Sequence, residues 1–264
     1  MKEQRGSFVA VSTGMLLAGH ITARCQKIIE EADVIYCLVP HALCETWLKN
    51  CNSNVKSLQP YYKKGRNRVQ TYEKMVDVMM NDVREGKRVC GAFYGHAGVF
   101  SCVPHMAIEQ SHKEGFVAYM EPGISAEACL YADLQIDPGN YGVQSIEATQ
   151  LMLFDHTLNT KGYILLWQIA IAGDHTASKF SSDESKLQCL VNHLYKDIPS
   201  DHEVIIYEAK FTPLDEVRKE KVKLMDLPKQ ELKLHSTLVI PPVQELEYDQ
   251  AMLRELGITG LEYT

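Results

Sequence analysis

The sequence lacks the long apolar runs of a membrane protein and the N-terminal signal peptide of a secreted protein. No stretch of the 264 residues approaches the ~18 consecutive apolar residues that a membrane span needs. The first residues, Met1–Gly6, contain no apolar core of the kind found in secretory signals. With 45% hydrophobic and 23% charged residues, the composition is that of an ordinary globular protein. We therefore expect a soluble, cytoplasmic protein without a membrane partner.

Several motifs of known chemistry are also absent. The eight cysteines include no Cys-x-x-Cys pair and are expected to be reduced thiols in a cytosolic enzyme. His41, Cys44 and Cys51 could begin a metal site, but no second half at zinc-ligand spacing follows, so no metal is predicted. No His-Glu-x-x-His, Gly-x-Ser-x-Gly or Gly-x-Gly-x-x-Gly occurs. The net charge of −7 argues against a nucleic-acid partner.

What is present is an alternation of strand and helix patterns in the first half of the chain. Short apolar runs typical of strands occur at 7–13, 34–39, 88–94 and 116–120. Between them, apolar residues recur at helical spacing. The clearest such helix runs from Tyr72 to Val83, and Gly86 ends it. This order predicts right-handed βαβ units and a mostly parallel sheet.

The second half has a different pattern. It predicts strands at 163–169, 203–207 and 237–240, separated by longer polar connections, and one good amphipathic helix at 184–195. Glu121-Pro122-Gly123 indicates a linker between the halves. We therefore predict an α/β fold of two domains, 1–122 and 123–245, followed by a helical tail at 246–264 with a short helix at 246–256.

Two glycine-containing loops follow predicted strands. They are Thr13-Gly14 and Tyr94-Gly95-His96-Ala97-Gly98. Ligands of open α/β sheets bind at the carboxyl ends of strands, where glycine lets the backbone approach closely. The first loop is weaker evidence, because a single glycine after a strand more often marks a simple turn. The second is more informative, because two glycines flank His-Ala directly after a buried strand, and His96 is expected to shape this loop.

A tyrosine-rich basic segment lies between the two loops, from Tyr61 to Tyr72. Arg68 and Tyr72 are four residues apart and would share one helical face. A solvated helix entrance is the simpler interpretation. A cation close to a tyrosine would lower the pKa of the phenol from its reference value of about 10, which favours a role as a base.

These pieces together resemble the tetrapyrrole methylase superfamily of S-adenosylmethionine-dependent enzymes. The resemblance rests on Val11–Gly14, Tyr94–Phe100, Glu121–Ala126 and Ser236–Pro242, in the expected order. It implies a two-domain fold, usually dimeric, with the methyl donor in the cleft between domains. The sequence departs from the family pattern at Ser12, where a glycine is usual, at Ala97, where a proline is usual, and after Gly14, where the proline is missing.

A narrower resemblance is to the borosin peptide backbone α-N-methyltransferases. It rests on Tyr62, Arg68, Tyr72 and Tyr94, with Leu165-Leu166-Trp167-Gln168. It implies α-N-methylation of backbone amides in a ribosomal precursor peptide. Because the chain stops at Thr264, we expect the split bacterial arrangement, in which the precursor is a separate peptide. A homodimer, and a heterotetramer with two precursors, would follow from the family.

The resemblance also assigns roles to individual residues. Tyr62 and Tyr72 would divide the duties of base and imidate stabiliser, Arg68 would favour the ionised tyrosine, and Tyr94 would orient the amide or border the donor. Trp167-Gln168 would line the peptide cleft. The residues mapped to S-adenosylmethionine, and to its product S-adenosylhomocysteine, are Thr13, Gly14, Tyr94, Val99, Cys102, Ser125, Ala126, Gln168, Ser236 and Thr237. For Ser125 and Thr237 the simpler readings are a helix N-cap and a strand threonine.

Three alternative functions stay open. A small-molecule methyltransferase acting on a porphyrin- or precorrin-like ring would share the fold. A ribosomal RNA ribose methyltransferase would share it too, although the net negative charge of the chain provides no evident basic surface for an RNA backbone. The third is a non-catalytic module that binds the donor or a peptide.

Overall fold

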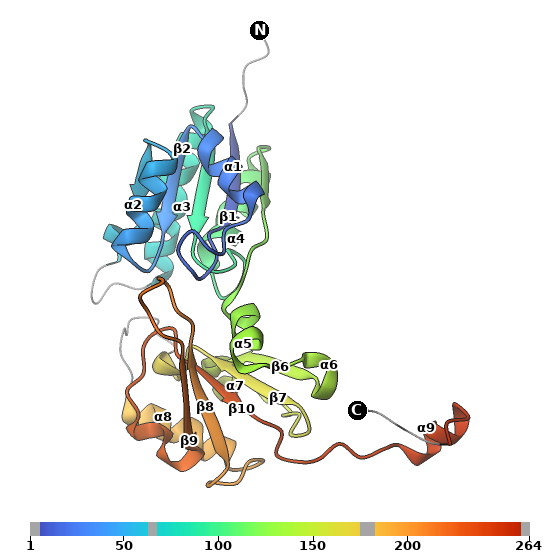
Figure 1. Cartoon of the computed structure of the whole chain (residues 1–264). Coiled ribbons are helices and arrows are strands. Elements are labelled where there is room, and N and C mark those ends of the chain that lie inside the picture. Colours follow the sequence, from blue (N-terminus) through green and yellow to red (C-terminus); the bar gives the residue numbers. More distant parts are fainter. Residues whose placement is uncertain (1–5, 63–67, 175–182, 260–264) are drawn as a thin grey trace.

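A computed structural model of the protein describes residues 6–62, 68–174 and 183–259. It contains two five-stranded sheets, one in each half of the chain, stacked one above the other along the long axis of the molecule (Figure 1). The α/β fold class is thereby confirmed. No helix in the described ranges combines the length and the apolar character that crossing a membrane requires.

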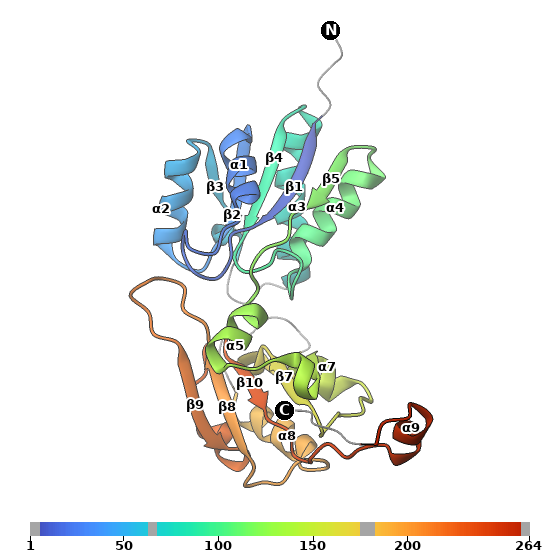
Figure 2. The same cartoon turned by 45° about the vertical axis from the view of Figure 1, so that its right-hand side comes forward.

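The first sheet is entirely parallel, as predicted. Its strand order is β3 (Val55–Ser57), β2 (Val34–Leu38), β4 (Arg88–Phe93), β1 (Ser7–Ser12) and β5 (Val117–Met120). Every residue of β2 is buried, which explains why this strand is a continuous apolar run. Helices α1 (Ala23–Glu31) and α2 (Ala42–Cys51) pack on one face, and α3 (Arg68–Arg84) and α4 (Cys102–Lys113) on the other (Figure 2).

The second sheet is mixed. Its order is β6 (Val143–Glu147), β7 (Tyr163–Trp167), β10 (Thr237–Ile240), β8 (Glu203–Glu208) and β9 (Arg218–Lys223), and only the β6–β7 pair is parallel. Helix α8 (Glu184–Leu194) corresponds to the predicted amphipathic helix. The shorter elements are η1 (Gln59–Tyr61), α5 (Ala126–Leu134), α6 (Pro138–Tyr141), α7 (Ala148–Leu153), η2 (Ile169–Ile171), η3 (Leu224–Lys229) and α9 (Gln250–Glu255).

Several elements differ from the sequence-based expectation, including strands β3 and β6, which were not predicted. Strand β7 ends at Trp167 rather than Ile169, because Gln168 has left-handed backbone angles (φ 58°, ψ 34°) and begins η2. Strand β9 was not predicted, since it is a charged edge strand whose side chains are largely exposed. Helix α9 begins at Gln250 rather than 246, because the Asp249 side chain caps it by accepting hydrogen bonds from the backbone N–H groups of Ala251 and Met252.

The two faces of the second sheet have different neighbours. One face forms a core with α7, α8 and η3. The opposite face packs under α5, and Met15 from the first half inserts there beside Leu165 and Tyr207. The two halves therefore meet at the loop that follows β1. The chain beyond β10 leaves the body as an extended arm that carries α9 (Figures 1 and 2).

Candidate functional site

The two predicted glycine loops lie side by side at the carboxyl ends of β1 and β4. Gly14 and Gly95 form an antiparallel bridge in which each backbone N–H donates to the carbonyl of the other, at 3.1 and 2.9 Å. Both have positive φ, +72° and +64°. A Cβ on Gly14 would lie 2.3 Å from Cβ of His20, so this turn accepts only glycine without rearrangement.

Ser12, which departs from the family pattern, has a structural role that the sequence did not reveal. Its buried hydroxyl donates to the carbonyl oxygen of Glu121 and accepts from the backbone N–H of Ala97, both at 2.9 Å. One side chain therefore joins the end of β1, the second glycine loop and the linker. His96 shapes its loop as expected, since its Nδ1 accepts from the N–H of Gly98 at 3.0 Å.

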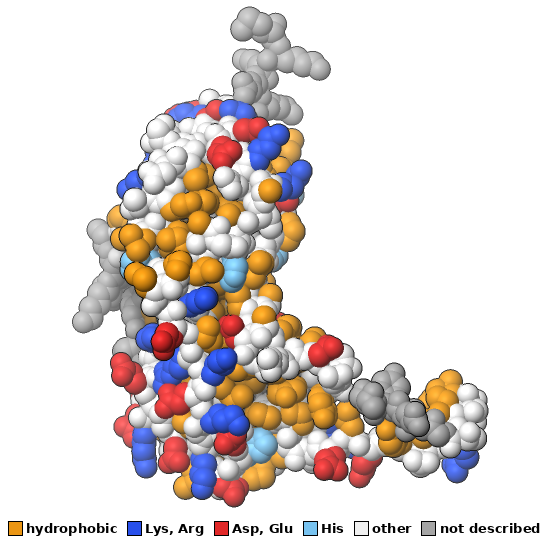
Figure 3. All heavy atoms as spheres, in the orientation of Figure 1, with side chains coloured by type: hydrophobic (Ala, Val, Ile, Leu, Met, Phe, Trp, Pro, Cys, Tyr) orange, Lys and Arg blue, Asp and Glu red, His pale blue; other side chains and the backbone are white. Residues whose placement is uncertain are grey.

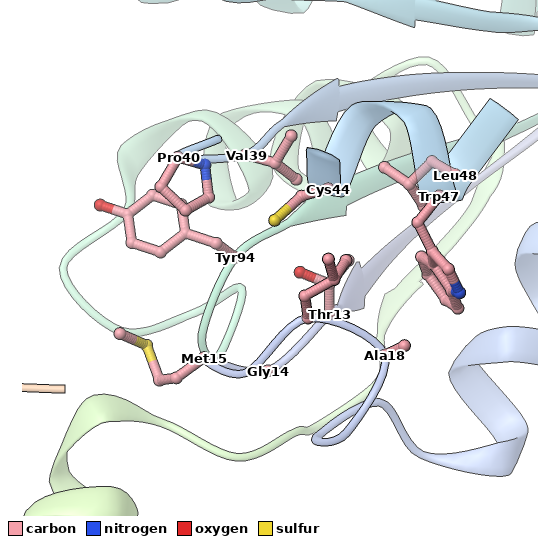
Figure 4. Close-up of a pocket in the computed structure, with 11 residues that line it drawn as sticks. Thr13, Gly14, Met15, Ala18, Val39, Pro40, Cys44, Trp47, Leu48 and Tyr94 are labelled. Carbon is pink, nitrogen blue, oxygen red and sulfur yellow. The ribbon is translucent and has the colours of Figure 1, made fainter. Parts of the chain in front are cut away.

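A pocket opens next to the first loop (Figure 4). It is lined by Thr13, Gly14, Met15, Leu17, Ala18, Val39, Pro40, Cys44, Trp47, Leu48 and Tyr94. Three of the predicted donor residues, Thr13, Gly14 and Tyr94, belong to it. The hydroxyl of Thr13 is engaged with the carbonyl of Phe93 at 3.2 Å. The remaining walls are apolar or aromatic.

The tyrosines and the arginine of the second motif converge. Arg68 is the first residue of α3, Tyr72 lies one turn later, and Tyr62 follows η1. The rings of Tyr62 and Tyr72 meet edge to face, with centroids 6.3 Å apart. The hydroxyl of Tyr62 shares a hydrogen bond with Tyr72, and both Tyr94 and Arg68 act on it electrostatically. Lys63 to Asn67, including the rest of the basic motif, lie outside the described residues.

Arg68 lowers the pKa of Tyr62, as expected, but larger effects raise this pKa overall. Desolvation raises the pKa of Tyr62 most, Tyr72 and Tyr94 raise it further, and the opposing effect of Arg68 is smaller. Desolvation also raises the pKa of Tyr94, with a further contribution from Tyr72, although 43% of this residue's surface is exposed. Burial outweighs the cation because a charged phenolate loses its hydration there. Both hydroxyls are therefore protonated at neutral pH.

The other mapped donor residues are distributed around the junction of the halves. Val99 and Cys102 are exposed, at the end of the second glycine loop and the start of α4. Ser125 caps α5, with its Oγ accepting from the N–H of Ala128 at 3.1 Å, and Ala126 is the first residue of that helix. Gln168 follows β7 and is half-buried.

Ser236 and Thr237, at the start of β10, are buried and do not line the pocket. The Ser236 hydroxyl donates to Oε1 of Glu208 at 2.7 Å and accepts from the N–H of Lys233 at 2.8 Å. Trp167 is also buried. Its indole N–H donates to Ser145 at 2.7 Å, and its ring packs against Phe100 at 5.5 Å.

The residues at this junction fit a donor such as S-adenosylmethionine in chemical type. The pocket supplies an aromatic and apolar wall for a flat base, in Trp47 and Tyr94. The capped N-terminus of the nine-residue helix α5 favours a carboxylate. Within the described ranges no group of three or more His, Cys, Asp or Glu side chains is arranged to hold a metal ion.

The charged side chains on one face of the second half are mixed in sign. Figure 3 shows Lys and Arg interspersed with Asp and Glu over β8 and β9, where Lys221 pairs with Glu203 at 2.7 Å and Arg218 with Glu220 at 2.5 Å. This face therefore presents no single-sign surface of the kind that tracks a phosphate backbone.

Comparison with known proteins gives two kinds of similarity. The chain is 35% identical over 96% of its length to a methyltransferase/ribosomally synthesized type I borosin cyclic peptide precursor of Coprinopsis marcescibilis, of which it covers 67%. It is also 35% identical over 90% of its length to a type II counterpart of Phlebiopsis gigantea, of which it covers 43%. Its fold is similar to that of a uroporphyrin-III-C-methyltransferase from Thermus thermophilus, with a TM-score of 0.63 at 14% identity, covering 98% and 99% of the two chains.

These relatives overturn the prediction of a separate precursor peptide. Their names join methyltransferase and precursor in one protein, which contradicts a partner supplied as a second chain. The predicted heterotetramer with two precursors depended on that partner and is wrong for the same reason. The prediction rested on the end of the sequence at Thr264, but the chain spans only 43% and 67% of these two relatives. Its last residue therefore does not show where the peptide substrate lies.

The family itself is established by a match that covers most of the described structure. Residues 7–223 match the family of Tetrapyrrole (Corrin/Porphyrin) Methylases. This range includes both glycine loops, the tyrosine–arginine cluster, the linker and four of the five strands of the second sheet. Together with the relatives above, this match shows that the chain belongs to the tetrapyrrole methylase family and is a homologue of the borosin methyltransferases.

Proposed function

We propose that this chain is an S-adenosylmethionine-dependent methyltransferase that α-N-methylates backbone amides of a ribosomally made borosin precursor peptide. The convergence of Tyr62, Tyr72, Tyr94 and Arg68 at the junction of the two halves carries this proposal. The names of the borosin relatives support the reaction class and the kind of substrate.

The chemical demand explains why such a cluster is useful. A peptide nitrogen is a poor nucleophile because its lone pair is delocalised into the carbonyl group. Its proton must be removed, and the negative charge that develops on the amide oxygen must be stabilised. The chemistry that S-adenosylmethionine would supply when bound is an electrophilic methyl group.

The contacts within the cluster support a division of these duties. The hydroxyls of Tyr62 and Tyr72 share a hydrogen bond, which adds to the effect of desolvation in raising the pKa of Tyr62. We assign proton acceptance to Tyr72, which meets the ring of Tyr62 edge to face and lies one turn from Arg68 on α3. Tyr94, kept protonated by desolvation, is assigned as the donor to the amide oxygen. Such a donor contributed about 2.7–4 kcal/mol in a protease oxyanion hole.

We assign donor binding to the pocket residues Thr13 and Gly14 and to the N-terminus of α5 at Ser125. Tyr94 lies between this pocket and the tyrosine cluster, since it lines the pocket and acts on Tyr62. From this position Tyr94 would border both the donor and the peptide amide, whose nitrogen would face the methyl group directly.

The test is intact-mass spectrometry of a synthetic Val/Ile/Leu-rich peptide, and of the chain itself, after incubation with S-adenosylmethionine. Successive gains of one methyl mass, localised by fragmentation to backbone nitrogens, are expected. Tyr72→Phe and Arg68→Ala are expected to lower kcat about 10²-fold or more while S-adenosylhomocysteine still binds. Tyr195→Phe, a partly exposed tyrosine that ends α8, is the matched control.

The proposal fails if methyl groups are found only on side chains, or if both cluster variants keep near-normal turnover. Methylation of a porphyrin-like ring in place of the peptide would favour the small-molecule alternative. Donor binding without any turnover would favour a non-catalytic role.

A further inference from the structure

An aromatic ring from the second half of the chain lies against Tyr94. Phe211 belongs to the β8–β9 connection, residues 209–217, which reaches up toward the first half (Figure 2). Its ring meets the ring of Tyr94 edge to face, with centroids 6.1 Å apart and planes at 84°. This is a favourable arrangement for two aromatic rings.

Phe211 is held from three sides. Its carbonyl oxygen accepts from the backbone N–H of Leu17 at 2.8 Å, in the loop that follows β1. Its own N–H donates to Oδ2 of Asp215 at 3.1 Å, and the same oxygen accepts from the N–H of Thr212 at 2.7 Å. The ring of His235 also meets the ring of Phe211 edge to face, with centroids 4.7 Å apart. The ring position of Phe211 is therefore determined by both halves of the chain.

The ends of the connection are also tied together. Glu208 is the last residue of β8 and is buried, and Arg218 is the first residue of β9. Nη1 of Arg218 lies 2.8 Å from Oε1 of Glu208, while Lys233 and Ser236 hold the same carboxylate at 2.9 and 2.7 Å. Because the last two residues precede β10, three segments share one carboxylate below Phe211 and His235.

We propose that Phe211 is a positioning residue for Tyr94. It acts through its edge-to-face contact with the Tyr94 ring, which holds the phenol in the orientation that the proposed role of its hydroxyl requires. The second half of the chain thereby sets the geometry of a cluster whose members all come from the first half. This inference rests on the proposed function through the role given to Tyr94.

The contact also bears on the hydration of Tyr94. Desolvation is the main reason for the raised pKa of this hydroxyl. An aliphatic side chain in place of Phe211 would fill part of the space but would not cover the ring edge. Water would then reach Tyr94 more easily, and the pKa of its hydroxyl would fall toward the ordinary value.

The experiment compares Phe211→Leu, which keeps an apolar side chain without the ring, with Phe211→Tyr, which keeps the ring. Phe154→Ala is the control, since Phe154 is 57% exposed and ends α7 away from the cluster. We expect Phe211→Leu to lower kcat about tenfold with unchanged S-adenosylhomocysteine affinity, and Phe211→Tyr to stay within about twofold of the parent. Phe154→Ala should match the parent.

A second measurement does not require activity. Carbon-13 NMR of ring-labelled tyrosine, with the Tyr94 signal identified from Tyr94→Phe, follows the titration of Tyr94 directly. Phe211→Leu should lower this pKa by at least about half a unit, and Phe211→Tyr should not. An unchanged Tyr94 titration in Phe211→Leu would overturn the inference, as would a kcat within about twofold of the parent. If the parent methylates no peptide, the proposed function fails, whereas the titration still decides whether Phe211 controls Tyr94.

Discussion

Removing the charge of Glu208 is expected to destabilise the second half of the chain at neutral pH. The side chain is 2% exposed. Burial by itself would raise the pKa of this carboxyl, but hydrogen bonds from Lys233, Ser236 and Arg218 outweigh burial and lower the pKa to about 2. In Glu208→Gln the shape is kept and the negative charge is lost, so Arg218 loses its buried anionic partner.

The magnitude follows from the depressed pKa. The ordinary value for this carboxyl is 4.5 and the folded value is about 2. Because the folded pKa is the lower one, the ionised carboxylate stabilises the fold at every pH above the ordinary value, and this stabilisation is lost as the pH falls toward 2. At about 1.36 kcal/mol per unit, the depression corresponds to about 3 kcal/mol. Glu208→Gln should therefore lower the free energy of unfolding by about 3 kcal/mol at pH 7.

The assay is urea unfolding followed by fluorescence in a Trp47→Phe background. The sequence has two tryptophans, so the fluorescence then comes from Trp167 in β7 of the second half. Glu114→Gln is the control: the pKa of Glu114 is also lowered to about 2, by hydrogen bonds from Arg84 and Gln110. That carboxylate is on the surface, where an ion pair contributes little, and no measurable loss is expected.

The reasoning is refuted if Glu208→Gln unfolds within about 1 kcal/mol of its background at pH 7. It is equally refuted if the difference does not shrink between about pH 5 and pH 3, since over this range the unfolded background chain, whose carboxyl has the ordinary pKa of 4.5, takes up protons while the folded carboxylate stays largely ionised.

Three further predictions concern the site. At Gly14 the φ is +72°, and an added Cβ would lie 2.3 Å from the Cβ of His20. Gly14→Ala should therefore weaken S-adenosylhomocysteine binding, measured by calorimetry, at least about tenfold. Gly115→Ala is the control, since Gly115 has φ +79° but open space around an added Cβ. It should lower the free energy of unfolding by only about 1–2 kcal/mol and leave S-adenosylhomocysteine binding unchanged. Equal binding by the two variants would contradict the role of the Thr13-Gly14 loop. Ser125→Ala removes the N-cap of α5 and should lower the free energy of unfolding by about 1 kcal/mol, measured by thermal melting. Burial holds the pKa of Tyr62 above its ordinary value of 10. The methylation rate, measured in a stopped assay, should therefore not decrease as the pH rises from about 7 to 10. A decrease that begins before about pH 9 would show that the Tyr62 hydroxyl ionises early.

Local patterns predicted the elements whose residues are buried in a regular way. Strand β2 is buried at every position, and α3 buries a stripe that includes Met75, Met79 and Val83. Strand β9, Arg218–Lys223, could not be found this way, because an exposed edge strand needs no apolar residues and is defined by its pairing with β8.

The site was predicted in part for the same reason. The four-residue step from Arg68 to Tyr72 places both on α3, as the sequence indicated. Ser236 was mapped to the donor by resemblance, whereas its hydroxyl is engaged with the buried carboxylate of Glu208. Ser12 was treated only as a departure from a pattern, although its hydroxyl joins three segments. No local signal marks such a bond, because its partners are far away along the chain.

The sequence by itself determined the strands and helices that bury apolar residues in a regular pattern, the two glycine turns and the residue types available for proton transfer, because periodicity, φ preference and side-chain chemistry are local properties. The tertiary structure decided which of those side chains meet and what water reaches them. Desolvation, rather than the adjacent arginine, sets the direction of the pKa of Tyr62. The partner of the Tyr94 ring is Phe211, from the other sheet. Burial and long-range contacts depend on how the two halves pack, and this packing cannot be inferred from any single segment of the chain.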